Sequence, residues 1–84
     1  MIVVDSSAVI AILENEDDAI VFARAIQQAD NLTMSAVNAH ECAVVLRGRR
    51  GPEGEQIAWT FLADNDVSIS SFDEIQARGA SEAF

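Results

Sequence analysis

The chain has 84 residues, which is enough for one small domain that buries about 60–65% of its unfolded surface. Half of the residues are hydrophobic and 23% are charged, a composition typical of globular chains and not of disordered ones. Fourteen acids against five arginines give a net charge of −9, and the absence of lysine excludes P-loop nucleotide binding, Schiff-base chemistry and the kinase mechanism.

Hydrophobic patterning predicts short strands that alternate with helices along the chain. Turn and capping residues set the boundaries, with Ser6 or Ser7 expected to cap the first helix and Ser35 the third. The predicted elements are strand 1–4, helix 8–13, helix 19–28, strand 32–34, helix 37 to 46 or 47, helix 53–63, strand 67–70 and helix 72–84. Strands separated by helices indicate an α/β fold with a parallel sheet and right-handed crossovers.

Two acids follow neighbouring predicted strands. Asp5 lies at the carboxyl end of the first strand, the edge where open parallel sheets bind ligands. Glu41 lies about two turns into the helix after the second strand, so adjacent strands about 4.8 Å apart would bring the two carboxylates together.

The neighbours of Glu41 on its helix strengthen this interpretation. Val37, Val44 and Val45 share its helical face, which would place an acid within an apolar surface. A buried carboxylate is costly unless it is paired, neutralised or bound to a metal, and two converging acids suit Mg²⁺ or Mn²⁺. The alternative is that Asp5 only caps the first helix while Glu41 faces solvent.

Other counts exclude further classes of protein. The single Cys42 cannot form an internal disulfide, and with one histidine it cannot complete an ordinary Cys/His zinc site. No apolar run approaches the roughly 18 residues of a membrane span, so we expect a cytoplasmic protein. The acidity disfavours a general nucleic-acid surface, so any nucleic-acid role must be local and metal-assisted.

Two segments resemble a known family. Residues 2–13 with Glu16 resemble the opening of a PIN domain of the VapC toxin type, in which the first strand ends in Asp followed by Ser or Thr. Residues 34–41 are similar to the family segment that delivers its second acid, and 46–51 and 67–84 follow the family in order and spacing. The resemblance implies a PIN-like three-layer α/β fold with helices flanking a parallel sheet.

The resemblance also implies a function. It is that of a metal-dependent endoribonuclease, the toxin component of a type II toxin–antitoxin system, which hydrolyses phosphodiester bonds in structured RNA such as tRNA or ribosomal RNA. Asp5 and Glu41 would be the catalytic residues that hold Mg²⁺ or Mn²⁺, and Ser6 would steady the site or contact substrate. The implied partners are a cognate antitoxin and the RNA. The alternative is a non-catalytic PIN-fold module that binds an antitoxin or itself, whereas a phosphotransfer receiver is disfavoured because there is no lysine and no Asp two residues after Asp5.

Family members are longer, and their additional segment carries a third and often a fourth acid. We therefore expect residues 1–84 to be a single PIN-like domain that stops before this C-terminal acidic segment and lacks the last strands. The first strand would then be an exposed edge, which predicts self-association into a homo-oligomer. Because two carboxylates hold Mg²⁺ weakly, we expect little nuclease activity from these 84 residues alone.

Three arginines, Arg47, Arg49 and Arg50, form a basic cluster after the third helix. They are candidate contacts for RNA or the antitoxin, and the alternative is that they only complement the helix dipole, worth about 0.3–1 kcal/mol each. His40 points about 100° away from Glu41 on a helix, so we expect a surface residue and not a general base. Cys42 is expected to be a small core residue.

Overall fold

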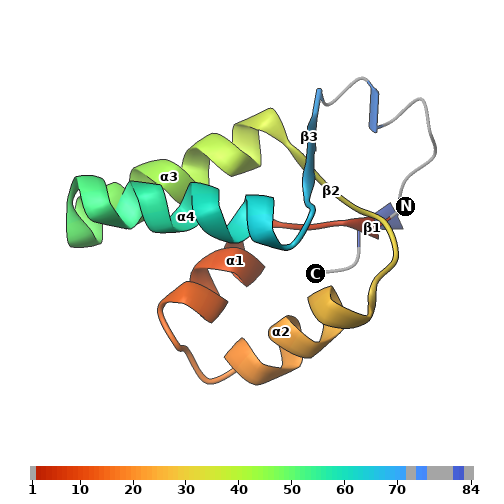
Figure 1. Ribbon diagram of the computed structural model, residues 1–84, viewed down its shortest axis with the longest axis horizontal. Coiled ribbons are helices and arrows are strands. Elements are labelled where there is room, and N and C mark those ends of the chain that lie inside the picture. The colour runs from red at the N-terminus through yellow and green to blue at the C-terminus, as the bar shows by residue number, and fades with distance from the viewer. Residues whose placement is uncertain (1, 72–73, 76–80, 83–84) are drawn as a thin grey trace.

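The computed structural model describes residues 2–71, 74–75 and 81–82. Figure 1 shows its elements, which are β1 (Ile2–Val3), α1 (Ser6–Leu13), α2 (Ala19–Gln28), β2 (Leu32–Ser35), α3 (Ala36–Arg50), α4 (Pro52–Asp64), β3 (Ser68–Ser70) and β4 (Ser81–Glu82). The predicted strands and first four helices are confirmed. Of the helix predicted over 72–84, residues 74–75 are helical, residues 81–82 are instead a strand, and the rest lies outside the described residues.

The four strands form one parallel sheet in the order β3-β2-β1-β4. Strand β2 pairs with β1 through Ile2 and Leu32, and β4 pairs with the other side of β1 through Ile2 and Ser81. The expectation that β1 is an exposed edge is therefore wrong, because β4 occupies that edge. Self-association through a free edge of β1 is therefore not supported either.

The strand order also fixes the layers. From β1 to β2 to β3 the chain steps in one direction across the sheet, so right-handed crossovers place α1 to α4 on the same face. Consistent with this, α1 packs against both α2 and α3, and α3 packs against α4. From β3 to β4 the chain steps back past two strands, and Ile75, one of the described residues between them, is buried. The three-layer α/β prediction is confirmed.

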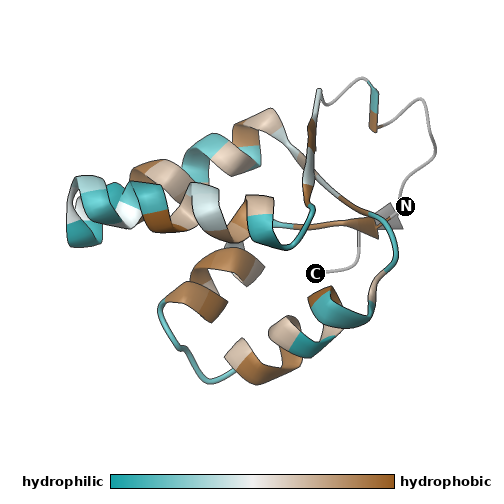
Figure 2. Cartoon of the chain, in the orientation of Figure 1, coloured by the Kyte–Doolittle hydropathy of each residue, from teal (hydrophilic) through white to brown (hydrophobic). Residues whose placement is uncertain are grey.

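The core lies between the sheet and the helices. Figure 2 shows that α1 is hydrophobic around most of its surface, as expected of a helix enclosed by its neighbours. Val4 from the end of β1, Val9 from α1, Met34 from β2 and Leu46 from α3 are all fully buried and belong to one cluster. This cluster holds α1 and α3 against the end of the sheet where Asp5 lies.

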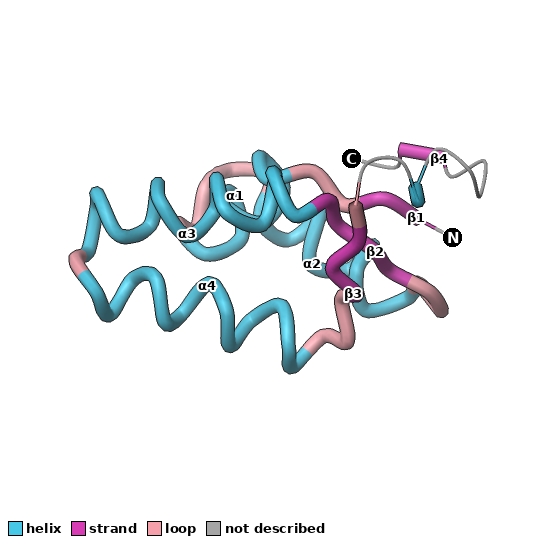
Figure 3. Tube along the Cα trace, turned by 90° about the horizontal axis from the view of Figure 1, so that it is seen from above, coloured by secondary structure: helices cyan, strands magenta, loops and turns pink. Residues whose placement is uncertain are grey.

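Helices α3 and α4 form an antiparallel hairpin, which Figure 3 shows side by side. The Ser35 hydroxyl accepts a hydrogen bond from the Asn38 amide, so the predicted cap of α3 is confirmed. Helix α3 extends beyond its predicted end at 46 or 47 to Arg50. Gly51 follows as the C-cap, and its φ of +75° suits glycine and allows the sharp turn into Pro52. None of the described helices is long and apolar enough to cross a membrane.

Candidate metal site

The chain passes from β1 into α1 within two residues. The Val4 amide donates to the Thr33 carbonyl over 2.8 Å, which anchors this junction beside β2. Asp5 has extended backbone (φ −89°, ψ 150°) at the N-cap position of α1, but its side chain makes no capping hydrogen bond. The prediction that Ser6 or Ser7 caps α1 is therefore wrong, because Ser6 is already the first helical residue. The alternative that Asp5 only caps the first helix is not supported, because the Asp5 carboxylate makes no hydrogen bond to the start of α1.

Ser6 connects the two acids that the sequence singled out. Its side chain is buried, and its hydroxyl donates to Glu41 Oε1 over 2.6 Å, a short bond typical of a hydroxyl facing a carboxylate. Asp5 Oδ1 lies 3.4 Å from the same hydroxyl oxygen. The structure thus brings Asp5, Ser6 and Glu41 together at the carboxyl end of β1, with one hydroxyl within reach of both carboxylates.

Glu41 does not lie in a buried apolar face, contrary to the expectation from its helical neighbours. Val37 is 73% exposed and Val44 is 53% exposed. The inward face of α3 is set instead by Ala39, Cys42, Ala43 and Leu46, which pack on α1 and α4. Glu41 is itself exposed, as the alternative expected, and its carboxylate reaches Ser6 while remaining open to a ligand from outside.

Cys42 lies directly beneath the two acids. Its side chain is fully buried, and the thiol lies 3.7 Å from the Ser6 carbonyl oxygen, to which it donates. Burial, followed by the negative charges of Glu41 and Asp5, raises the pKa of the Cys42 thiol to about 12. This raised pKa keeps the thiol protonated at neutral pH, and Cys42 is a core residue as predicted.

The chemistry of the donor set favours a hard cation. Among the described residues, no arginine or histidine forms an ion pair with Asp5 or Glu41, so their charges are not compensated by the protein there. Nor do the described residues contain a group of three or more acidic, His or Cys side chains placed to hold a metal. Two carboxylates fit Mg²⁺ or Mn²⁺, because these ions fill their remaining coordination positions with water or phosphate oxygens.

A parallel sheet in the order β3-β2-β1-β4, with acids at the end of β1 and on α3, can be compared with known families. A family model described as PIN domain matches residues 2–84. The chain belongs to the PIN domain family. The family resemblance noted in the sequence is thereby confirmed.

The relatives of this PIN domain carry ribonuclease names. It is 37% identical over 82 residues to VapC ribonuclease Mb0625 of Mycobacterium bovis and to Ribonuclease VapC28 of Mycobacterium tuberculosis, an alignment covering 98% of this chain and 62% of each relative. Ribonuclease VapC42 of Mycobacterium tuberculosis is 33% identical over 82 residues, covering 98% of this chain and 63% of the relative. The chain thus spans less than two thirds of the length of these relatives.

The basic cluster of this PIN domain lies in the last turn of α3, and not after the helix as predicted, and it is paired with acids. Arg47 lies 3.3 Å from Glu55 on α4, and Arg50 lies 3.3 Å from Glu14, just after α1. Arg49 lies 3.9 Å from a carboxylate oxygen of Glu14 and of Glu16. All three side chains keep about half of their surface exposed, so pairing does not bury the cations.

Sequence reasoning placed His40 correctly at the surface, where the structure exposes it. It missed Glu14, which follows the predicted helix 8–13 and was given no role. Its side chain is only 18% exposed and faces two arginines that follow it by more than 30 residues. The signal available in the sequence was an acid that directly follows an apolar helix, opposite the one basic cluster of the chain.

Proposed function

We propose that this PIN domain belongs to a metal-dependent endoribonuclease, the toxin component of a type II toxin–antitoxin system, which hydrolyses phosphodiester bonds in structured RNA such as tRNA or ribosomal RNA. The observation that carries the proposal is the convergence of the Asp5 and Glu41 carboxylates on the Ser6 hydroxyl at the end of β1. The relatives named VapC ribonucleases support the choice of RNA as substrate class.

The three residues have distinct roles in this proposal. Asp5 and Glu41 would hold Mg²⁺ or Mn²⁺ through one carboxylate each, leaving the remaining positions to water and to phosphate oxygens of the RNA. When bound, the cation would activate water and neutralise charge on the scissile phosphate. Ser6 orients Glu41 by donating to Oε1, so that the other carboxylate oxygen is directed away from the hydroxyl.

The cation also reconciles the substrate with the charge of the protein. A chain with a net charge of −9 repels an RNA phosphate over most of its surface. The uncompensated pair Asp5 and Glu41 concentrates negative charge where a divalent ion would reverse it. The RNA backbone is then attracted to this edge of the sheet.

Partners are part of the proposal. The cognate antitoxin is the expected partner, in the cytoplasm where the RNA substrate is found, and a second copy of the chain is the other candidate. Among the described residues, six large apolar side chains on α2, α3, α4 and β3 are at least 38% exposed and are candidate contacts for a protein partner: Ile20, Val21, Val37, Val44, Trp59 and Ile69.

Removal of the ion tests the activity. We expect the protein expressed from its complete reading frame to cleave tRNA or ribosomal RNA in Mg²⁺ or Mn²⁺, and cleavage to stop in EDTA and return when Mg²⁺ is restored. The 84 residues alone should show little cleavage, because two carboxylates hold Mg²⁺ weakly. The measurement is gel analysis of RNA fragments over time. Cleavage that persists in EDTA would contradict the metal dependence. A folded protein that binds an antitoxin but cleaves no RNA would favour the non-catalytic module.

The basic cluster is proposed to contact RNA or the antitoxin as well as its acidic neighbours. Replacing Arg47, Arg49 and Arg50 with Gln should flatten the slope of log Kobs against log salt by about 2 if all three contact phosphates. Filter binding of an uncleaved RNA in Ca²⁺ over a range of salt concentrations measures this slope. An Arg24→Gln variant on α2 is the control, because Arg24 is not part of the cluster. An unchanged slope in the triple variant would restrict the cluster to its structural ion pairs.

A further inference from the structure

Helices α1 and α3 are joined at both of their ends. Near their starts, the Ser6 hydroxyl donates to Glu41 over 2.6 Å. Near their ends, Arg50 Nη2 donates to the Leu13 carbonyl oxygen over 3.3 Å. The two helices therefore run in the same direction, and the proposed metal site lies at one end of their shared interface. The residues at the opposite end of this interface can influence the site only through the two helices.

The opposite end of the interface contains an ion pair between Arg50 and Glu14, and the Glu14 side chain has little access to solvent. Glu14 is 18% exposed, and its Oε1 lies 3.3 Å from Arg50 Nε, a charge contact without hydrogen-bond geometry. Arg50 thus contacts two successive residues at the end of α1, the Leu13 carbonyl through Nη2 and the Glu14 carboxylate through Nε. The first contact satisfies a carbonyl that the helix leaves unpaired, and the second compensates a largely desolvated carboxylate.

We propose that Glu14 and Arg50 are positioning residues, which set the placement of α3 along α1 and thereby hold Glu41 at the correct distance from Asp5 to bind a divalent ion. This inference rests on the proposed function, since it assumes that Asp5 and Glu41 are the metal ligands. It goes further in assigning a role to a pair that lies outside the site.

The lengths of the helices make the coupling direct. From Ser6 to Leu13 the rise along α1 is about 10 Å, and from Glu41 to Arg50 the rise along α3 is about 13 Å. Over such short distances helices behave as rigid bodies, so a shift of α1 along α3 at one end moves Ser6 against Glu41 by a similar amount. A hydrogen bond of 2.6 Å lengthens beyond its useful range with a shift of less than 1 Å.

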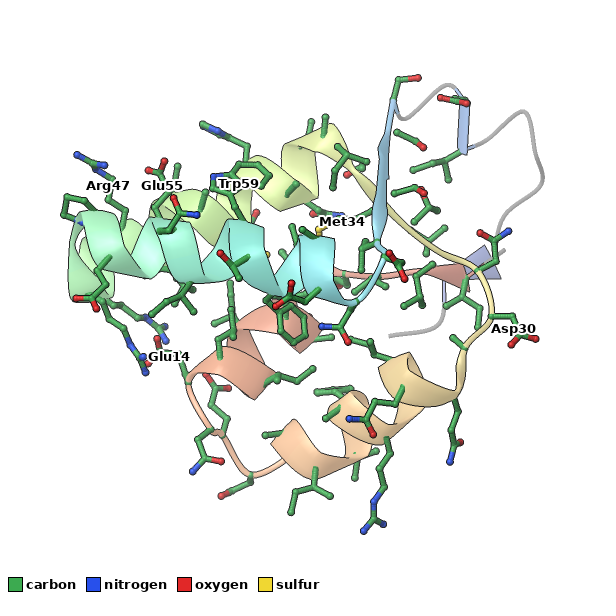
Figure 4. The ribbon with its side chains drawn as sticks, viewed as in Figure 1. Glu14, Asp30, Met34, Arg47, Glu55 and Trp59 are labelled. Carbon is green, nitrogen blue, oxygen red and sulfur yellow. The ribbon has the colours of Figure 1, made fainter. Side chains whose placement is uncertain are left out.

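A second ion pair provides a matched control. Arg47 and Glu55 lie at the same 3.3 Å, but they join α3 to α4 and leave α1 untouched. Figure 4 shows Arg47 and Glu55 together on one side of the α3–α4 hairpin and Glu14 on the other side. Loss of the Arg47 pair affects only the contact between α3 and α4, whereas replacing Glu14 removes its contacts with both Arg50 and Arg49 and so loosens α1 from α3.

The test measures Mn²⁺ binding, which does not depend on activity. In the protein expressed from its complete reading frame, the affinity for Mn²⁺ is read from the electron paramagnetic resonance signal of the free ion. Glu14→Gln and Arg50→Gln should each weaken binding about tenfold, as is usual when the support of a metal ligand is lost, and the double variant should lose less than the product of the two losses because the residues contact each other. Arg47→Gln should bind Mn²⁺ like the parent protein.

Several outcomes would overturn the inference. One is parental Mn²⁺ affinity in Glu14→Gln, and another is an equal loss of affinity in Arg47→Gln, which would indicate a general effect of weaker folding. Asp5→Asn separates the two proposals: if it does not weaken Mn²⁺ binding, the metal site itself is wrong, whereas weakened binding in Asp5→Asn with none in Glu14→Gln rejects only the positioning role. If Glu14→Gln does not fold, Arg50→Lys replaces it in the test. Lysine keeps a positive charge beside Glu14 but lacks the guanidinium Nη2 that donates to the Leu13 carbonyl. Parental Mn²⁺ affinity in Arg50→Lys would contradict the proposal.

Discussion

Replacing Asp5 with Asn is expected to reduce RNA cleavage at least a hundredfold and to weaken Mn²⁺ binding at least tenfold, with little change in stability. A carboxylate ligand to a catalytic ion contributes several kcal/mol to the transition state, and each 1.36 kcal/mol is a factor of about ten in rate. Asparagine keeps the shape of the side chain and removes only its charge. Stability should be retained because the Asp5 side chain makes no capping hydrogen bond to α1.

The measurements are initial rates of RNA cleavage at saturating Mg²⁺, Mn²⁺ affinity, and urea unfolding of both proteins. Asp30→Asn is the matched control: Asp30 is an exposed acid in the turn before β2, at the opposite end of the strands, and Figure 4 shows it away from the α3–α4 hairpin. It removes the same charge and should leave cleavage unchanged. Cleavage retained in Asp5→Asn, or lost equally in Asp30→Asn, would reject Asp5 as a ligand.

The convergence of the two acids could be predicted from chain order alone. Parallel strands place their carboxyl ends at one edge of a sheet, so an acid after β1 and an acid on the helix after β2 approach each other whatever the details. The rotation of α3 about its axis could not be predicted in the same way. Val37, Val44 and Val45 offered one apolar face, but Ala39, Cys42 and Leu46 form the face that packs, because small residues let α1 and α4 approach closely.

The edge of the sheet was mispredicted for a different reason. Residues 81–82 are polar and lack the β-branched pattern of a strand, and they pair with β1 because the sheet supplies hydrogen-bonding partners and not because of their own propensity. Glu14 was overlooked because its partner, Arg50, is 36 positions away in the sequence. Contacts between elements that are distant in the chain decide both points, and a local pattern shows at most one of the two partners.

Replacing Gly54 with Ala is expected to destabilise the protein by about 2–3 kcal/mol, although alanine is the better helix former. A Cβ at this position would collide with the Leu46 carbonyl oxygen and lie 2.8 Å from Arg50 Cβ and 2.9 Å from the Leu46 carbonyl carbon. Two of these three atoms belong to the backbone of α3, which cannot move aside as a flexible side chain would. Helices α3 and α4 must then separate, which opens the contact that also involves Ala58 and Leu62.

Replacing Gly48, in the same hairpin, is expected to have the opposite effect on stability. It lies inside α3, and a Cβ there would meet no atom within 4 Å, so Gly48→Ala should stabilise the protein by about 0.5–1 kcal/mol through helix propensity alone. Urea unfolding followed by circular dichroism measures both changes. For 84 residues the total stability is of the order of 4–13 kcal/mol, so the Gly54 variant should lose a large part of it and melt about 10 °C or more below the parent. If both substitutions stabilised the protein, the close approach of α3 and α4 at Gly54 would be wrong, and with it the packing that orients α3 toward Ser6.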